Sequence, residues 1–532
     1  MRSRATADQP QISSALGRST AVMAAGTALS RLTGFGRLVA LAYALGFTRL
    51  TDSYNLANVT PNIVYELVLG GILSATLVPL FVDQLTTEDE EHAWRAISAV
   101  ITAAAAVLVV VTALFLLVAP LLVRLYTLGN DTPSLDDQRA VATALLRLFA
   151  PQVAFYGVTF LVTAVLNARR RFAAPMFAPV LNNLVVIAML VALPHVVDDV
   201  SLDAVRQDRG ALLLLGLGTT AGVAAMAVAL LPSLRAAGAH LRFVWDPGHP
   251  AVRTIFRLSG WTFGFVAANQ VALLVVLVLA GGRAGDVAAY QAGQVFFLLP
   301  HGIFAVSVMT ALQPDLAERW AVGDMAGFGR QVAVGLRTIA VVVVPAAVGY
   351  VLLARPIVSV ALEHGALRAG SAATTAGVLA LLALGLPGFS TFLFVARAYQ
   401  SMQDTRSLFF LYLWENGVNV VLAVVLYPSL GVHGLALSYS VAYTAAAVAG
   451  VVQLQRRARS VDMAGVVQTW ARIAFASAVM AAVVAALSAL PTPAVVKAGA
   501  GVIAGVTVYL AVASRLRIRE LSGVLRTRRG LP

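Results

Sequence analysis

The sequence predicts an all-α polytopic membrane protein with about 14 transmembrane helices, arranged as two six-helix lobes and a terminal helix pair. Two observations predict this class. The 532 residues are 59% hydrophobic and only 12% charged, with a mean hydropathy of +0.83, which is typical of integral membrane proteins and excludes a soluble globular fold. The apolar runs are continuous and long, unlike the roughly 10-residue alternating segments of a membrane β-barrel.

Each predicted span is an apolar run long enough for a bilayer whose hydrocarbon core requires about 20 helical residues. In chain order, we expect the spans at residues 20–46, 54–82, 96–123, 141–167, 173–197, 210–234, 258–281, 286–315, 333–354, 372–399, 407–427, 432–453, 471–490 and 494–514. Residues 1–19 contain no separate apolar region before a cleavage site, so we expect a cytoplasmic tail rather than a signal peptide. Cysteine is absent, which excludes disulfides and thiolate metal sites.

The distribution of basic residues orients these spans. If the N-terminal tail and every even-numbered loop lie on one side, that side holds 26 of the 38 basic residues, including Arg169, Arg170 and Arg171. The positive-inside rule then places both termini in the cytoplasm, including the basic tail at 515–532.

A polar segment containing proline and glycine, at residues 235–257, divides the spans into six before it and eight after it. We interpret it as a cytoplasmic linker between an N-lobe (20–234) and a C-lobe (258–455), with spans 13 and 14 in residues 456–514. Transporters are often built from such repeats, with the substrate site between them.

Two arginines, Arg31 and Arg37, fall inside the first predicted span. Only 12 residues separate Arg18 from Arg31 and 11 separate Arg37 from Arg49, so a spanning helix must carry both charges. Each costs roughly 2.5–3.5 kcal/mol at mid-bilayer, which favours a function such as anion binding. Pairing with Glu66 or Asp52 is the structural alternative.

Glycines and a polar stripe accompany these arginines. Gly34 and Gly36 permit a bend or a close helix approach. In the second span, polar residues recur with the helical spacing i, i+3, i+7, i+11, which indicates one face turned toward a cavity or a partner helix. Its members are Asn55, Asn58, Asn62 and Glu66, and Asp52 lies at the outer end of the first hairpin. Packing between helices is the alternative to a cavity wall.

Further along the chain, Glu415, Asn416 and Asn419 lie within an otherwise apolar span. A carboxylate there is a candidate for coupling to a proton or a sodium ion, and a hydrogen-bonded structural carboxyl is the alternative. Pro300 interrupts the eighth span and is a candidate hinge, with a packing role as its alternative.

No enzyme constellation stands out in the sequence, which contains no P-loop, no HExxH motif and no GxSxG motif with convincing partners. We therefore predict a transporter without catalytic residues, metal site or cofactor. No ATP-binding domain is recognisable, so a Na⁺ or H⁺ gradient, the membrane potential or downhill movement would drive transport.

Four stretches carry a resemblance to the MurJ/MviN family of lipid II flippases, in the multidrug/oligosaccharidyl-lipid/polysaccharide exporter superfamily. They are Ser30-Arg-Leu-Thr-Gly-Phe-Gly-Arg37; Thr51-Asp52 with Pro61-Asn62 and Ser74 to Pro79; Leu166 to Pro179 with Leu181-Asn182; and Ala398 to Thr405. The third is similar to the pattern LNxxxRFxxPxFAPxxLN and is the most specific. The resemblance covers nearly the whole chain.

The resemblance implies alternating access of a cavity between two lobes, a prenyl-tail groove continued by spans 13 and 14, and a bacterial plasma membrane. Arg31, Arg37 and Asp52 match family positions tied to function, and arginine suits the pyrophosphate of lipid II. The chain departs from the family where Tyr65 and Glu66 replace a basic pair. The family has a glutamate at the position of Gly70. It has an arginine at about the position of Val295, and this chain lacks that arginine.

These features predict a flippase that moves lipid II, the undecaprenyl-pyrophosphate-linked peptidoglycan precursor, to the outer leaflet during cell-wall synthesis. The departures and the Ala/Arg/Val bias indicate a divergent, actinobacterial-like branch. One alternative is a cation-coupled exporter of drugs or another polyprenyl-linked glycan. A second is a membrane scaffold for cell-wall synthesis proteins. We expect the bilayer and lipid II or a related glycan lipid as partners, and no nucleic acid.

Overall fold

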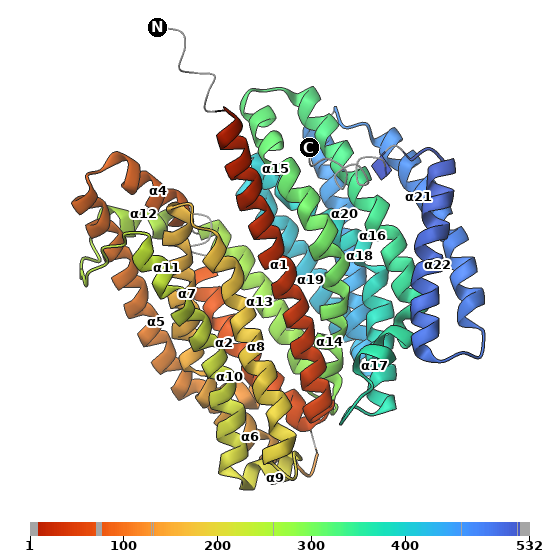
Figure 1. The fold of residues 1–532 in the computed structure, drawn as a ribbon, viewed down its shortest axis with the longest axis horizontal. Helices are drawn as coiled ribbons and strands as arrows, with labels where there is room; N and C mark the ends of the chain where they lie inside the picture. Colours follow the sequence, from red (N-terminus) through yellow and green to blue (C-terminus); the bar gives the residue numbers. More distant parts are fainter. Residues whose placement is uncertain are drawn as a thin grey trace. The chain divides into compact units, whose positions relative to one another are not determined.

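The computed structural model describes residues 9–70, 77–128, 130, 132–258, 260–458, 460–518 and 520–521, with backbone alone for 9–24, 69–70, 255–258 and 260–262. Every regular element in these ranges is a helix, as the sequence predicts (Figure 1). Ser74 and parts of both predicted tails lie outside the described residues.

The chain packs as two compact units. Unit 1 comprises the described residues up to Leu45 together with Arg49–Ala267, and unit 2 comprises Gly46–Thr48 and the described residues from Ala268 onward. The segment 235–257, predicted as a linker between lobes, belongs to unit 1, where Ala251 and Val252 are buried in the core. The ranges assigned above to the two lobes and the terminal pair stay predictions.

Unit 1 begins with two long helices and a π-helical turn. Its elements are α1 (Gln9–Leu45), α2 (Arg49–Tyr65), η1 (Glu66–Gly70), α4 (Leu77–Thr87), α5 (Glu90–Tyr126), α6 (Leu135–Phe149), α7 (Pro151–Ala168), α8 (Ala173–Val196), α9 (Leu202–Gln207), α10 (Arg209–Ala229), α11 (Leu231–Ala236), α12 (Pro250–Leu258) and the start of α13 (Gly260–Ala280). The Asp208 side chain accepts hydrogen bonds from the N–H groups of Gly210 and Ala211, which caps α10.

Two apolar clusters form the core of unit 1. The first joins α1, α2, α6, α8 and α10, and the second joins α4, α5, α7 and α10 with α11 and α12. Helix α1 packs along α8 so closely that a Cβ at Gly26 would lie 2.8 Å from the Met176 Cβ. Glycine at that position therefore permits the approach of the two helices.

Unit 2 contains the remaining helices. They are the rest of α13, then α14 (Asp286–Pro300), η2 (His301–Ala305), α15 (Val306–Ala321), α16 (Met325–Leu362), α17 (Ala369–Leu384), α18 (Leu386–Ser401), α19 (Thr405–Leu430), α20 (Val432–Arg457), α21 (Met463–Ser488) and α22 (Ala494–Arg515). The last two pack on α16, where Trp470 Nε1 donates to the Leu336 carbonyl over 3.2 Å and the Tyr509 hydroxyl to the Val341 carbonyl over 2.7 Å.

Within the described residues, 11 helices are long and apolar enough to cross a membrane, or up to 12 if the bent pair α17–α18 is one span. They correspond in order to predicted spans 3 to 14. The first two predicted spans fall on α1, which carries Arg31 and Arg37, and on α2, which has 17 residues before η1. The helical membrane class is confirmed, whereas the count of 14 stays a prediction.

Candidate functional site

The two arginines of the first predicted span both lie on α1 but differ in burial. Arg31 is exposed and Arg37 is half-buried. The structure records no ion pair of either arginine within the part of the chain that it describes, so neither is paired with Glu66 or Asp52 there. The structural alternative to anion binding therefore gains no support from the described contacts.

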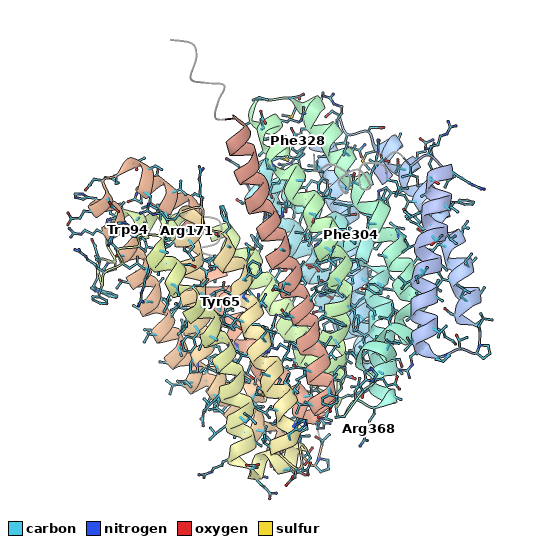
Figure 2. The ribbon with its side chains drawn as sticks, viewed as in Figure 1. Tyr65, Trp94, Arg171, Phe304, Phe328 and Arg368 are labelled. Atoms are coloured by element: carbon cyan, nitrogen blue, oxygen red, sulfur yellow. The ribbon has the colours of Figure 1, made fainter. Side chains whose placement is uncertain are left out.

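An aromatic cluster of α2 and α7 lies within electrostatic range of Arg37 through Tyr156. The Arg37 guanidinium is close enough to Tyr156 of α7 to act on that phenol electrostatically. The rings of Tyr156 and Tyr65 lie 5.7 Å apart, Phe160 lies 6.1 Å from Tyr65, and Glu66 adjoins Tyr65. Figure 2 shows Tyr65 toward the middle of unit 1, away from the end that carries Trp94 and Arg171. Sequence reasoning missed Tyr156 and Phe160, although a tyrosine within an apolar span was a usable signal.

The polar stripe of α2 is graded in exposure. Asp52 is 1% exposed and Asn55 7%, whereas Asn58 is half-buried and Asn62 is exposed. Glu66 is half-buried and begins the π-helical turn, which changes the helical register beyond it. The cavity-lining role of these five residues stays a prediction, and Asp52 and Asn55 are enclosed in this conformation.

Tyr54 and Thr60 of α2 make hydrogen bonds to neighbouring helices. The Tyr54 hydroxyl lies 2.8 Å from Thr219 Oγ1 of α10, and Thr60 Oγ1 lies 3.0 Å from the Tyr126 hydroxyl of α5. Because these pairs already join α2 to its neighbours, interhelical packing does not require the exposed Asn62.

The two glycines of α1 lie against α8. A Cβ at Gly34 would be 3.6 Å from Asn183 Nδ2, and a Cβ at Gly36 would be 3.4 Å from Ile187 Cδ1. The same Asn183 amide donates to the Ser30 carbonyl oxygen and to Thr33 Oγ1. Helix α1 continues through both glycines, so their observed role is helix packing and a hinge there stays a prediction.

Glu415 is the centre of a buried polar group in unit 2. It is 1% exposed, and its Oε2 has no hydrogen-bond partner among the described residues. It lies close enough to Tyr290, Tyr412 and Tyr439 to act on them electrostatically. A buried carboxylate in a membrane helix requires a proton or a cation to offset its desolvation.

The two asparagines that follow Glu415 bond to neighbouring helices. Asn416 Nδ2 donates to Asn269 Oδ1 of α13 over 2.7 Å, and Ser438 Oγ of α20 donates to Asn419 Oδ1 over 3.1 Å. The structure thus gathers Glu415, Asn416 and Asn419 with amide and hydroxyl groups from α13 and α20. Such oxygens are suitable ligands for a hard cation.

Pro300 coincides with a change of helix geometry. Helix α14 ends at Pro300 and is followed directly by the π-helical η2. His301 Nδ1 lies 3.0 Å from Ser390 Oγ, and its ring centroid is 4.7 Å from that of Phe389. The interruption predicted at Pro300 is therefore present, and movement about it stays a prediction.

An apolar groove of about 420 Å³ lies within unit 2. It is lined by α16, the junction of α17 and α18, α20 and α21; Val448 and Val467 on its rim are 61% and 63% exposed. The helix of predicted span 13 contributes to it, and none of its described lining residues belongs to α22.

Comparisons with known proteins agree on one family. The family model described as "Lipid II flippase MurJ" matches residues 41–498. A "Probable lipid II flippase MurJ" of Rhizobium tropici is 28% identical over 459 residues, covering 86% of this chain and 84% of the relative. A protein of the same description from Thermotoga maritima is 27% identical over 515 residues, covering 96% and 98%.

Solved structures share the fold. One described as lipid II flippase MurJ in an inward closed conformation has a TM-score of 0.78 at 22% identity, covering 94% of this chain and 99% of that chain. An inward-facing multidrug resistance MATE family transporter of the MOP superfamily has a TM-score of 0.66 at 12% identity, covering 82% and 98%. At these identities the likeness concerns the fold alone.

Proposed function

The chain belongs to the lipid II flippase MurJ family, and from this premise we propose that it moves lipid II from the inner to the outer leaflet of a bacterial plasma membrane. The observation that carries the proposal is the family match across residues 41–498, which includes Asp52 and the buried group around Glu415. A non-enzymatic, multi-pass transporter with both termini in the cytoplasm is consistent with this assignment.

We assign head-group binding to Arg31 and Arg37. Lipid II carries a pyrophosphate, and guanidinium groups offer planar, charge-assisted donors to phosphate oxygens. Support comes from the partial burial of Arg37 without a recorded ion pair in the described chain, within electrostatic range of Tyr156. Because the family's basic pair is replaced here by Tyr65 and Glu66, these two arginines supply more of the binding energy than in a typical member.

We assign the prenyl tail to the groove between α16, the α17–α18 junction, α20 and α21. Its lining is apolar, which suits an isoprenoid chain, and the exposed Val448 and Val467 leave its rim open. The tail then remains in an apolar environment while the head group crosses.

We assign ion coupling to Glu415 with Asn416 and Asn419. A proton or Na⁺ bound there neutralises a carboxylate whose Oε2 has no partner in the described chain. The membrane potential is a further energy source, worth about 2.3 kcal/mol per charge per 100 mV. This buried carboxylate also favours the second candidate, a cation-coupled exporter of another polyprenyl-linked glycan.

Reconstitution tests both candidates. Purified protein in vesicles is expected to move fluorescently labelled lipid II between leaflets, and a Na⁺ or proton gradient is expected to change the rate. Movement of another undecaprenyl-linked glycan, with none of lipid II, would overturn the leading proposal and favour the second. The chain has no cysteine, so an introduced cysteine at Asn62 reports protection by each substrate.

A further inference from the structure

A loop segment of unit 1 displays large aromatic side chains. Leu241–Trp245 lies within the connection from α11 to α12, and in it Phe243 is 83% exposed and Trp245 62% exposed. Exposure of two such side chains to water is unfavourable, since removing apolar surface from water is favourable in proportion to its area. The exposed pair therefore indicates a partner surface, and no part of the substrate path proposed above uses it.

The segment is fixed along helix α5 by two hydrogen bonds. The Arg242 N–H donates to Ser98 Oγ over 3.1 Å, and the Val244 N–H donates to Thr102 Oγ1 over 3.2 Å. Two residues of extended chain advance about 6.6 Å and four helical residues advance 6 Å, so the spacings match. Alternate residues of an extended segment share a face, which groups Phe243 with Trp245. Both are exposed, whereas Val244 between them is half-buried.

Helix α5 gives the depth of this segment in the bilayer. Its exposed apolar side chains run from Val107 to Leu121, with a centre at Leu114. At 1.5 Å per residue, Thr102 lies about 18 Å and Ser98 about 24 Å from that centre, against a hydrocarbon half-thickness of about 15 Å. The segment therefore runs through the interfacial layer, where aromatic side chains are enriched in membrane proteins.

The charges beside the aromatic pair are mainly positive. Residues 235–253 contain Arg235, Arg242 and Arg253 against Asp246, and the three arginines are exposed. The acidic residues at the start of α5 extend to Glu91, which lies about 10 Å further from the hydrocarbon than Ser98. Helix α12 and the Trp94 end of α5 lie at the same end of unit 1, which the positive-inside rule places in the cytoplasm (Figures 1 and 2).

We propose that Leu241–Trp245 is an interfacial anchor that binds anionic phospholipid of the cytoplasmic leaflet. Phe243 and Trp245 insert between head groups, and Arg242 binds lipid phosphate. Amphipathic segments with aromatic and basic residues bind this layer through burial of apolar surface and through electrostatic attraction to anionic lipid. A basic residue near an anionic surface contributes about 1 kcal/mol.

Nitroxide labels on single cysteines test the proposal, because the full-length chain contains no native cysteine. The test labels are at Phe243→Cys and Trp245→Cys, with Glu88→Cys as an aqueous control and Leu117→Cys as a hydrocarbon control. In vesicles containing phosphatidylglycerol, we expect both test labels to be shielded from a water-soluble nickel reagent and to lie shallower than the label at Leu117.

A separate variant tests the contribution of the Arg242 charge. In phosphatidylglycerol vesicles, Arg242→Gln is expected to lower the ratio of inserted to water-exposed label about fivefold, whereas the exposed Arg206→Gln leaves it unchanged. Phosphatidylcholine vesicles should reduce the effect of Arg242→Gln. Labels at 243 and 245 as accessible to nickel as the Glu88 label would overturn the proposal. Shielding of these labels in native membranes, but not in vesicles that contain no other protein, would overturn the proposal in favour of a protein partner.

Discussion

Replacement of Arg37 by glutamine is expected to weaken substrate binding without lowering stability. Charged hydrogen bonds contribute about 1.5–3 kcal/mol, so loss of the guanidinium should weaken lipid II binding by about 10- to 150-fold. The described chain records no ion pair of Arg37, so the variant leaves no recorded carboxylate unpaired. Removing a charge that costs roughly 2.5–3.5 kcal/mol in a membrane should keep or raise the melting temperature.

The assay measures lipid II binding to purified protein by native mass spectrometry, and unfolding by the change in tryptophan fluorescence on heating. Arg37→Lys retains the charge but loses the planar donor pair, so an intermediate loss of affinity is expected. Arg319→Gln is the matched control, because Arg319 bonds to both Asp315 and Asp324 at 3.1 Å and 2.8 Å. It should lower the melting temperature and leave lipid II affinity unchanged.

Two results would refute this reasoning. If the lipid II affinity of Arg37→Gln is within twofold of the wild-type value, Arg37 does not bind the head group. A large fall in melting temperature, with weaker binding only in proportion to unfolded protein, would instead assign Arg37 a structural role.

Three further predictions concern unit 2. Glu415→Gln keeps the size of a side chain that is 1% exposed, so we expect normal membrane levels but loss of gradient-stimulated lipid II movement in vesicles; retained stimulation would exclude the coupling role. Val448→Trp and Val467→Trp should slow movement of full-length lipid II by filling the groove, whereas Val424→Trp, an exposed control outside the groove lining, should not. The pKa of Asp462 is lowered by the Gly465 N–H and by Arg337, so its carboxylate stabilises the fold above its unfolded pKa of about 3.9 and the effect is lost as pH falls through the lower folded pKa. Asp462→Ala should therefore lower the melting temperature at pH 7, and the difference should shrink below about pH 4.

The sequence predicted those elements whose signal is local. Predicted spans 3 to 14 each match a helix, or the bent pair, because a continuous apolar run is sufficient to define a membrane helix. The break in span 10 was not predicted. There, a Cβ at Gly385 would lie 2.4 Å from the Ser440 Cα, and Ser440 Oγ donates to the carbonyl oxygens of Leu381 and Leu382. That bond compensates for the broken helix but comes from another span, so local pattern could not indicate it.

The candidate site shows the same division. The sequence alone reveals a charged residue within an apolar run, and this is how Arg31, Arg37 and Glu415 were found. Two residues depend on helix pairs separated by more than 100 residues: Asn183, which bonds to Ser30 and Thr33, and Tyr156, which lies within electrostatic range of Arg37. Residues that complete a site from another helix become apparent only when the packing is known.

The roles assigned to the arginines and to Glu415 require that lipid II binding and cation binding be thermodynamically linked. If both act in one transport cycle, the factor by which Na⁺ or a proton changes lipid II affinity must equal the factor by which lipid II changes affinity for that cation. Measuring each binding constant with and without the other ligand therefore tests the cycle. Glu415→Gln should bring both factors to one, whereas Arg37→Gln should weaken lipid II binding and leave intrinsic cation affinity unchanged. Unequal factors in the wild-type protein would show that an additional binding equilibrium contributes. Factors of one in the wild-type protein would show that cation binding at Glu415 is not coupled to lipid II binding.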